Sequence, residues 1–61
     1  LPAQLSEAET RAAIKQVIAE TEASGLKDMG RTMALLKERH AGAIDFGKAS
    51  QWVKEALTAG A

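Results

Sequence analysis

The stretch SGLKDMGRTMALLKERH, residues Ser24 to His40, decides the fold of this chain. Its large apolar side chains recur at spacings of three, four and three residues, at Leu26, Met29, Met33 and Leu36. Such spacings place them on one face of an α-helix. The pattern therefore predicts a turn followed by a central helix from about Leu26 to Arg39. We expect Met33 to be buried between the helices that pack on either side of it.

Two further features of this stretch refine the prediction. Gly30 and Ala34 border the apolar face, where their small size would let another helix approach closely. Glycine lowers helix stability by about 1 kcal/mol relative to alanine, so its presence suggests a close contact. Leu35 points the other way, which indicates that this helix buries two of its sides.

The residues before this stretch predict a first helix from about Glu7 to Glu22. Ser6 and Glu9 have the S-x-x-E spacing of a capping box, which satisfies free amides at a helix start. An apolar stripe follows, made of Ile14, Val17 and Ile18. The sequence Ala23-Ser24-Gly25 ends this helix, since glycine can adopt the left-handed conformation that other residues avoid.

The residues after this stretch predict a third helix from about Phe46 to Thr58. Gly42 is the expected stop of the central helix and Asp45 the N-cap of the next one. Apolar residues then follow the helical template without a gap, at Phe46, Ala49, Trp52, Val53, Ala56 and Leu57. The fold class is therefore all-α, a compact three-helix domain.

Sixty-one residues make one domain at most, and a chain of this length buries only about 60% of its unfolded surface. Pro2 restricts Leu1 to extended backbone, so we expect a domain boundary at Leu1–Gln4. Residues 1–5 then form a linker, and residues 6–61 form the helical domain. The chain lacks an initiator Met, which suggests that it is part of a longer protein.

Charge and composition exclude several classes of protein. The eight basic and eight acidic residues cancel, which argues against a strongly electrostatic partner. The charge is uneven along the chain, with two basic and four acidic residues in 1–26 and six and four in 27–61. There is no cysteine, no apolar run long enough for a membrane span and no signal-peptide pattern. We expect a cytoplasmic protein without a membrane contact.

The sequence offers little for catalysis. His40 is the only histidine, and next to a glycine turn it is expected to favour the helix dipole rather than to act as a base. No metal-binding or phosphate-loop spacing is present, so we expect no metal, no cofactor and no catalytic residue. Met29, Met33 and Trp52 lie on apolar helix faces, where a core role is favoured over a binding role.

The basic residues of the second half of the chain are the remaining candidates for a binding site. They are Lys27, Arg31, Lys37, Arg39 and Lys48. Two interpretations are equally compatible with their positions: they contact the phosphates of a nucleic acid, or they form a solvated surface with local ion pairs.

Two runs of the sequence carry a resemblance to a known family. AETEASGLKDMGRTMALLKERHAG, followed by DFGKASQWVKEAL, resembles the C-terminal domain of YqeY-like proteins. The same module is similar to the tail domain of GatB, a subunit of the tRNA-dependent amidotransferase. The opening LPAQLSEAE resembles the junction that follows an N-terminal helical hairpin in this family. Glu22 stands where the family often has glycine.

The resemblance implies an all-helical fold of the GatB/YqeY type and a missing N-terminal hairpin. It implies kinship with carbon–nitrogen ligases that use glutamine as amide donor, although their catalytic residues lie in other domains and subunits. The first functional hypothesis is an accessory module that binds tRNA or another RNA. The second is a protein-interaction module that docks the alanines of the first helix and Leu35 on its own hairpin or on a partner. An independent ligase activity is third.

Overall fold

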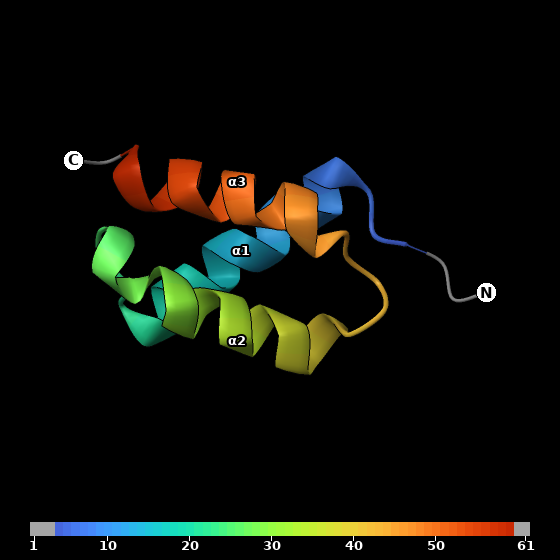
Figure 1. Cartoon of the computed structure of the whole chain (residues 1–61), viewed down its shortest axis with the longest axis horizontal. Helices are drawn as coiled ribbons and strands as arrows, with labels where there is room; N and C mark the ends of the chain where they lie inside the picture. Colours follow the sequence, from blue (N-terminus) through green and yellow to red (C-terminus); the bar gives the residue numbers. More distant parts are fainter. Residues whose placement is uncertain (1–3, 60–61) are drawn as a thin grey trace.

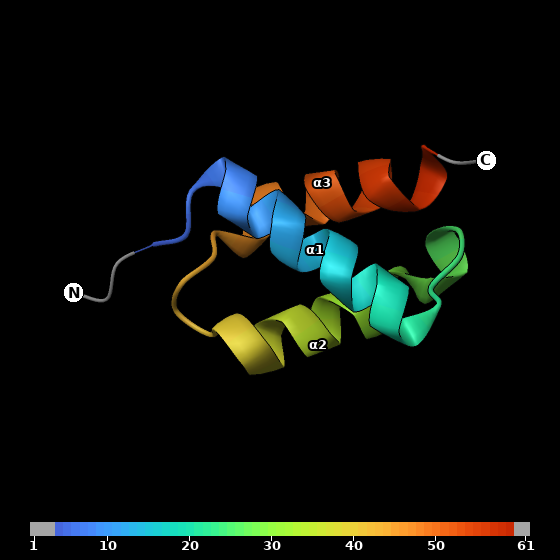
Figure 2. The same cartoon turned by 180° about the vertical axis from the view of Figure 1, so that it is seen from behind.

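The computed structural model describes residues 4–59, which form three helices and a short 3₁₀ turn. In chain order these are α1 (Glu7–Thr21), η1 (Leu26–Asp28), α2 (Met29–His40) and α3 (Phe46–Thr58). α2 and α3 lie side by side, and α1 covers one side of the pair (Figure 1). From the back, α1 runs obliquely across both (Figure 2). The predicted all-α three-helix fold is confirmed, and the described residues contain no strand.

The core lies where the three helices meet. Each helix contributes side chains that are at most 1% exposed, including Ile14 of α1, Leu36 of α2 and Val53 of α3. Ile44, in the connection between α2 and α3, closes one end of this core. Because the cluster is small, each of its members carries a large part of the stability of the domain.

Local hydrogen bonds begin α1 and α3 where the sequence predicts. The amide of Glu9 donates to the Ser6 hydroxyl (3.0 Å), and the amide of Ser6 donates to the Glu9 carboxylate (2.8 Å). The capping box is therefore complete. The Asp45 carboxylate accepts from the amides of Gly47 and Lys48 at 3.0 and 3.2 Å, which confirms it as the N-cap of α3.

The connection between α1 and α2 differs from the prediction. The α-helix begins at Met29 rather than at Leu26, because residues 26–28 form the 3₁₀ turn. Such a turn has three residues per turn instead of 3.6, so Leu26 is rotated off the apolar face of α2 and is 51% exposed. Gly25 has the predicted positive φ of 71°, and Glu22, at the end of α1, is left-handed as well (φ 55°).

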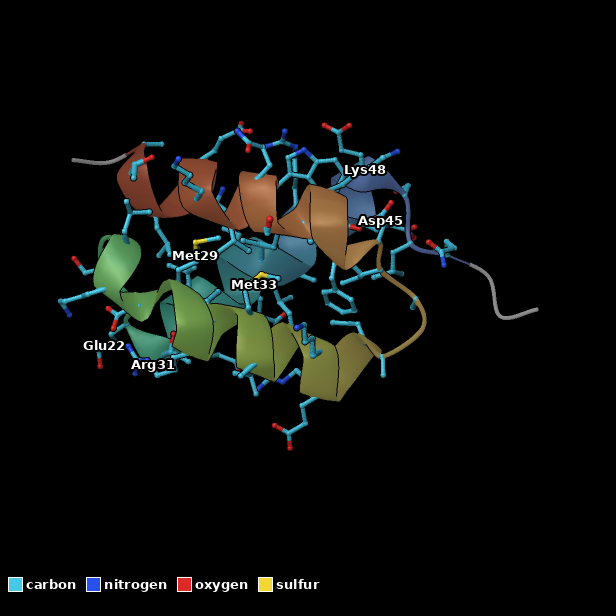
Figure 3. The ribbon with its side chains drawn as sticks, in the orientation of Figure 1. Glu22, Met29, Arg31, Met33, Asp45 and Lys48 are labelled. Atoms are coloured by element: carbon cyan, nitrogen blue, oxygen red, sulfur yellow. The ribbon has the colours of Figure 1, made fainter. Side chains whose placement is uncertain are left out.

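The position of Met33 corrects a second prediction. Met29 and Met33 are half-buried and lie between α2 and α3 on the side turned away from α1 (Figure 3). Met33 is therefore not enclosed between α1 and α3. Leu36 takes the central place, because α1 packs against the side of α2 that carries Leu36 and Thr32, both fully buried.

Gly30 corrects a third prediction. It is exposed, and a Cβ atom added to it would meet no atom within 4 Å. Ala34 is exposed as well. The close helix contact that we expected at Gly30 is therefore absent from the described part of the domain. Gly30 is the second residue of α2, in its first turn, where the cost of glycine is smaller than the roughly 1 kcal/mol of a helix interior, and no packing within residues 4–59 requires it.

The segment before α1 is attached to the domain. The amide of Leu5 donates to the carbonyl of Ala43 at 2.8 Å, and the Leu5 side chain packs against the core. Leu5, assigned to the linker in the prediction, thus contacts the connection between α2 and α3. The rest of the predicted boundary, Leu1 to Ala3, lies outside the described residues, as do Gly60 and Ala61. No described helix is long and apolar enough to cross a membrane.

Candidate nucleic-acid interface

Arg39, one of the five predicted phosphate contacts, is bound within the domain. Its guanidinium donates two hydrogen bonds to the Glu20 carboxylate on α1, the longer of them 3.1 Å. These bonds lower the pKa of Glu20 and raise that of Arg39. The pair joins α2 to α1, and its two charges cancel. Arg39 is therefore the least suited of the five to bind an external phosphate.

Lys27 and Arg31 are brought together by Asp28. Lys27 Nζ lies 3.2 Å from one carboxylate oxygen and Arg31 Nη2 lies 3.3 Å from the other. The amide of Ser24 also donates to this carboxylate (2.7 Å); this bond, more than the two cations, lowers the pKa of Asp28. The Lys27 and Arg31 side chains stay 78% and 54% exposed. Asp28 thus holds them in place at the start of α2 and leaves their outer surfaces open to a ligand.

Lys37 and Lys48 lie toward the other end of the molecule. Lys37 Nζ is 5.9 Å from the centre of the Phe46 ring, a cation–π contact between α2 and α3. Lys48 lies beside Asp45 at the start of α3, at the end opposite to Arg31 (Figure 3). Within residues 4–59, neither lysine forms an ion pair. The five predicted residues therefore form two separate groups and one internal ion pair, rather than a single cluster.

One basic residue that the sequence analysis missed is Lys54. Phe46, Ser50 and Lys54 follow one another at intervals of four residues, so they share one side of α3. The Phe46–Lys37 contact shows that this side borders α2. Lys54 forms no ion pair with any described carboxylate. The four-residue spacing from Phe46 was the signal in the sequence that could have identified it.

Met29 and Met33 lie on the side of the α2–α3 pair that α1 leaves uncovered, a surface that we call the α2–α3 face (Figure 3). Helical position and the Lys37–Phe46 contact assign its other members, which are Gly30 and Lys37 of α2 and Phe46, Ser50 and Lys54 of α3. Glu38 lies about 140° from Met33 and about 180° from Met29 around α2, away from the apolar centre of the face, and Glu55 pairs with Arg11 on the side of α1. The α2–α3 face therefore carries two lysines, Lys37 and Lys54, and no carboxylate by helical position.

Most of the carboxylates on or beside α1 already bind a partner within the domain. Glu7 and Glu55 both pair with Arg11, at 2.9 and 3.7 Å, and Glu9 serves the capping box. Arg11 also lies 5.2 Å from the centre of the Trp52 ring. Trp52 is half-buried against the core, as predicted, and its ring is partly covered by this guanidinium. It is therefore a poor platform for a stacked base.

Among the clefts that the described residues form, two are of appreciable volume, and the side chains that line them do not make up a catalytic group. The larger, about 540 Å³, lies between the starts of α1 and α3 and is lined by Glu7, Asp45, Lys48 and Trp52 among others. The smaller, about 430 Å³, contains His40 but no serine or aspartate. Among the described side chains, no three His, Asp or Glu residues gather closely enough to hold a metal ion.

The second predicted interaction surface is divided by the fold. Leu35 is half-buried and packs against the core. The alanines on the outer side of α1, Ala8, Ala12 and Ala19, are exposed. Leu35 is thus already used inside the domain, and the alanines alone offer little apolar area to a partner.

Comparison with protein families gives one match that covers nearly all of the chain. A family model described as Yqey-like protein matches residues 1–57. No curated protein matches the chain.

Proposed function

The chain belongs to the YqeY-like family, and from this premise we propose that it is an accessory RNA-binding module, related to the tail domain of tRNA-dependent amidotransferases, that binds tRNA and carries no catalytic residue itself. Its ligand would be the phosphate backbone. No residue of the domain is placed to read a base, so sequence specificity would have to come from elsewhere.

The observation that carries the proposal is the separation of charge in the folded domain. Glutamates gather on and beside α1 and are paired there with Arg11 and Arg39. Apart from Lys15, which is exposed on α1, the basic groups that remain exposed are at the η1 end, on the α2–α3 face and at the start of α3. They are Lys27, Arg31, Lys37, Lys48 and Lys54. Away from α1 these five cations thus outnumber the three carboxylates of Asp28, Glu38 and Asp45, although the chain has no net charge.

The spacing of these groups supports contact with several phosphates. Arg31 and Lys37, both on α2, are six residues apart, roughly 9 Å along the helix at 1.5 Å per residue. Phosphates of one nucleic-acid strand follow each other every 3.4 Å or so of helix axis, so about three of them span this distance. With about three to five phosphates neutralised, log affinity should fall against log salt with a slope of about −2 to −4.

The test is a tRNA titration of the protein at several salt concentrations, with variants that remove charge and keep helix propensity. Lys27→Gln combined with Arg31→Gln should weaken binding and make the slope shallower by about 1.4–1.8, from roughly 0.7–0.9 per phosphate contact. Lys15→Gln on α1 is the control, because Lys15 is exposed and forms no ion pair within the described residues. An equal loss in the control, or no binding of the parent at low salt, would remove the proposal.

A further inference from the structure

No contact within the described domain explains why α2 has a glycine, and not a larger residue, at position 30. Glycine weakens a helix, and this one has neither a positive φ nor a neighbour that a side chain would strike. Alanine would fit the same place with open space around its Cβ. A glycine without an internal reason on a helix surface is suited to close approach by another molecule.

The residues around Gly30 are unusually apolar for a surface. Met29 and Met33 flank it on α2 and are only half-buried, and Phe46 across the face is half-buried too. Both methionines of the chain point into the space between α2 and α3 on the side away from α1 (Figure 3). Methionine is flexible and polarisable, and it is frequent at surfaces that adapt to a partner helix.

The charges on this surface indicate that a partner would be acidic. Lys37 and Lys54 stand on its two sides, one on each helix, and neither is paired with a described carboxylate. Helical position places no acidic residue between them. A partner that covered the apolar centre would therefore gain by bringing carboxylates to both lysines.

The arrangement of the helices indicates that the partner is itself a helix. α1 covers one side of the α2–α3 pair, and no helix of residues 4–59 covers the opposite side (Figures 1 and 2). α2 is 12 residues long, roughly 18 Å, which matches about three turns of a further helix. Small residues allow helix axes to approach closely, and Gly30 and Ser50 provide them on both sides.

We propose that the α2–α3 face docks one amphipathic helix of a partner protein, whose apolar side rests on Met29 and Met33 and whose carboxylates meet Lys37 and Lys54. Gly30 is the point of closest approach. The two proposals share Lys37 and Lys54, but the test of RNA binding removes charges at Lys27 and Arg31, which lie outside this surface. The two proposals can therefore fail separately.

The experiment uses a helical peptide of about 18 residues, stapled by a hydrocarbon link, with a leucine stripe and glutamates along both edges. A second peptide has every glutamate replaced by lysine. The two ε-methyl groups of Met29 and Met33 are the only methionine signals of the chain, so ¹³C-methyl NMR locates binding directly. We expect the acidic peptide to shift both signals and the basic peptide to shift neither.

Variants then test the contacts. Gly30→Leu should weaken binding of the acidic peptide by at least tenfold while the thermal midpoint stays at or above that of the parent, which separates loss of binding from loss of folding. Ala19→Leu on α1 is the matched control and should bind as the parent does. Lys54→Glu combined with Lys37→Glu should reverse the preference, so that the basic peptide binds more tightly than the acidic one.

Three outcomes would overturn the proposal: no methyl shift with the acidic peptide, equal binding of the two peptides, or full binding by Gly30→Leu. A fourth would reassign the surface. If tRNA shifts both methyl signals and Gly30→Leu abolishes that shift while the acidic peptide does not bind, the α2–α3 face is an RNA surface and the helix-docking proposal is wrong.

Discussion

Replacing Glu22 by glycine should stabilise the domain. Glu22 ends α1 in the left-handed conformation, with φ 55° and ψ 35°, and its amide donates to the carbonyl of Ile18. The amide of Ala23 donates to the same carbonyl at 3.1 Å. The Glu22 side chain is exposed and makes no hydrogen bond among the described residues. Glu22 therefore contributes to the helix end through its backbone alone, and glycine adopts the same backbone conformation without strain.

The size of the effect follows from two opposing terms. A side chain in the left-handed region costs roughly 1–2 kcal/mol. Glycine offsets part of this gain by about 0.4–1 kcal/mol, because it increases the conformational entropy of the unfolded chain. The conformational gain is therefore about 0.5–1 kcal/mol. For a domain of this size 1 kcal/mol corresponds to roughly 4–8 °C, so the midpoint should rise by about 2–8 °C.

Charge contributes separately and needs its own control. A carboxylate at the C-terminal end of a helix is unfavourable by about 0.3–1 kcal/mol, and glycine removes that cost as well. Glu22→Ala removes the same charge but keeps a side chain in the left-handed conformation. The difference between the glycine and alanine variants in thermal and urea unfolding therefore measures the conformational part. If the alanine variant is as stable as the glycine variant, or more so, the reasoning is refuted.

Two other predictions concern the core and the acid response. Leu36→Ala should cost about 3–5 kcal/mol, whereas Met33→Ala, at a half-buried position, should cost about 1–2 kcal/mol; urea unfolding that gave the reverse order would contradict the described packing. The pKa of Glu20 is lowered by its hydrogen bonds from Arg39, so this pair stabilises the fold above about pH 4.5 and its contribution is lost as the pH falls further. Glu20→Gln should accordingly be less stable than the parent at pH 7 and show a shallower loss of stability between pH 4.5 and 2, measured by circular dichroism; an unchanged acid profile would exclude the pair as a contributor.

The starts of α1 and α3 could be predicted from the sequence because they depend on near neighbours, whereas the predicted start of α2 lies three residues too early. Ser6 and Glu9 are three residues apart, and Asp45 bonds amides two and three residues ahead. Such contacts form in one turn of chain, whatever the rest of the molecule does. The same holds for Gly25, whose positive φ follows from its own lack of a side chain.

The rotation of α2 could not be predicted in the same way. Met33 and Leu36 lie about 60° apart around the helix, and the apolar stripe is wide enough to include both. Which of them is central depends on where α1 packs, a contact between residues far apart in sequence. Thr32 shows the difficulty: it is polar, yet it is fully buried, because its hydroxyl donates to the carbonyl of Asp28 at 2.9 Å.

The candidate site was predicted in part for the same reason. Lys27 and Arg31 lie within four residues of each other, and their proximity was readable from the sequence. The pairing of Arg39 with Glu20 spans 19 residues and depends on how α1 crosses α2. Periodicity assigns a charge to a side of its own helix, but only the packing of helices decides whether that side meets an opposite charge.

Net charge is therefore a weak guide to what this domain binds. The two-to-four excess of acids in residues 1–26 and the six-to-four excess of bases in 27–61 cancel in the total. Folding mixes them only in part: Arg11 pairs with Glu55 and Arg39 with Glu20, while α1, which carries no more than three of the eight acids, packs on one side of the α2–α3 pair (Figure 2). Part of the asymmetry along the chain thus becomes an asymmetry between two faces. At short range a ligand responds to the face that it meets, since at physiological salt charges more than about 8 Å away are largely screened. For the α2–α3 face that charge is positive, and both a phosphate backbone and an acidic helix are complementary to it.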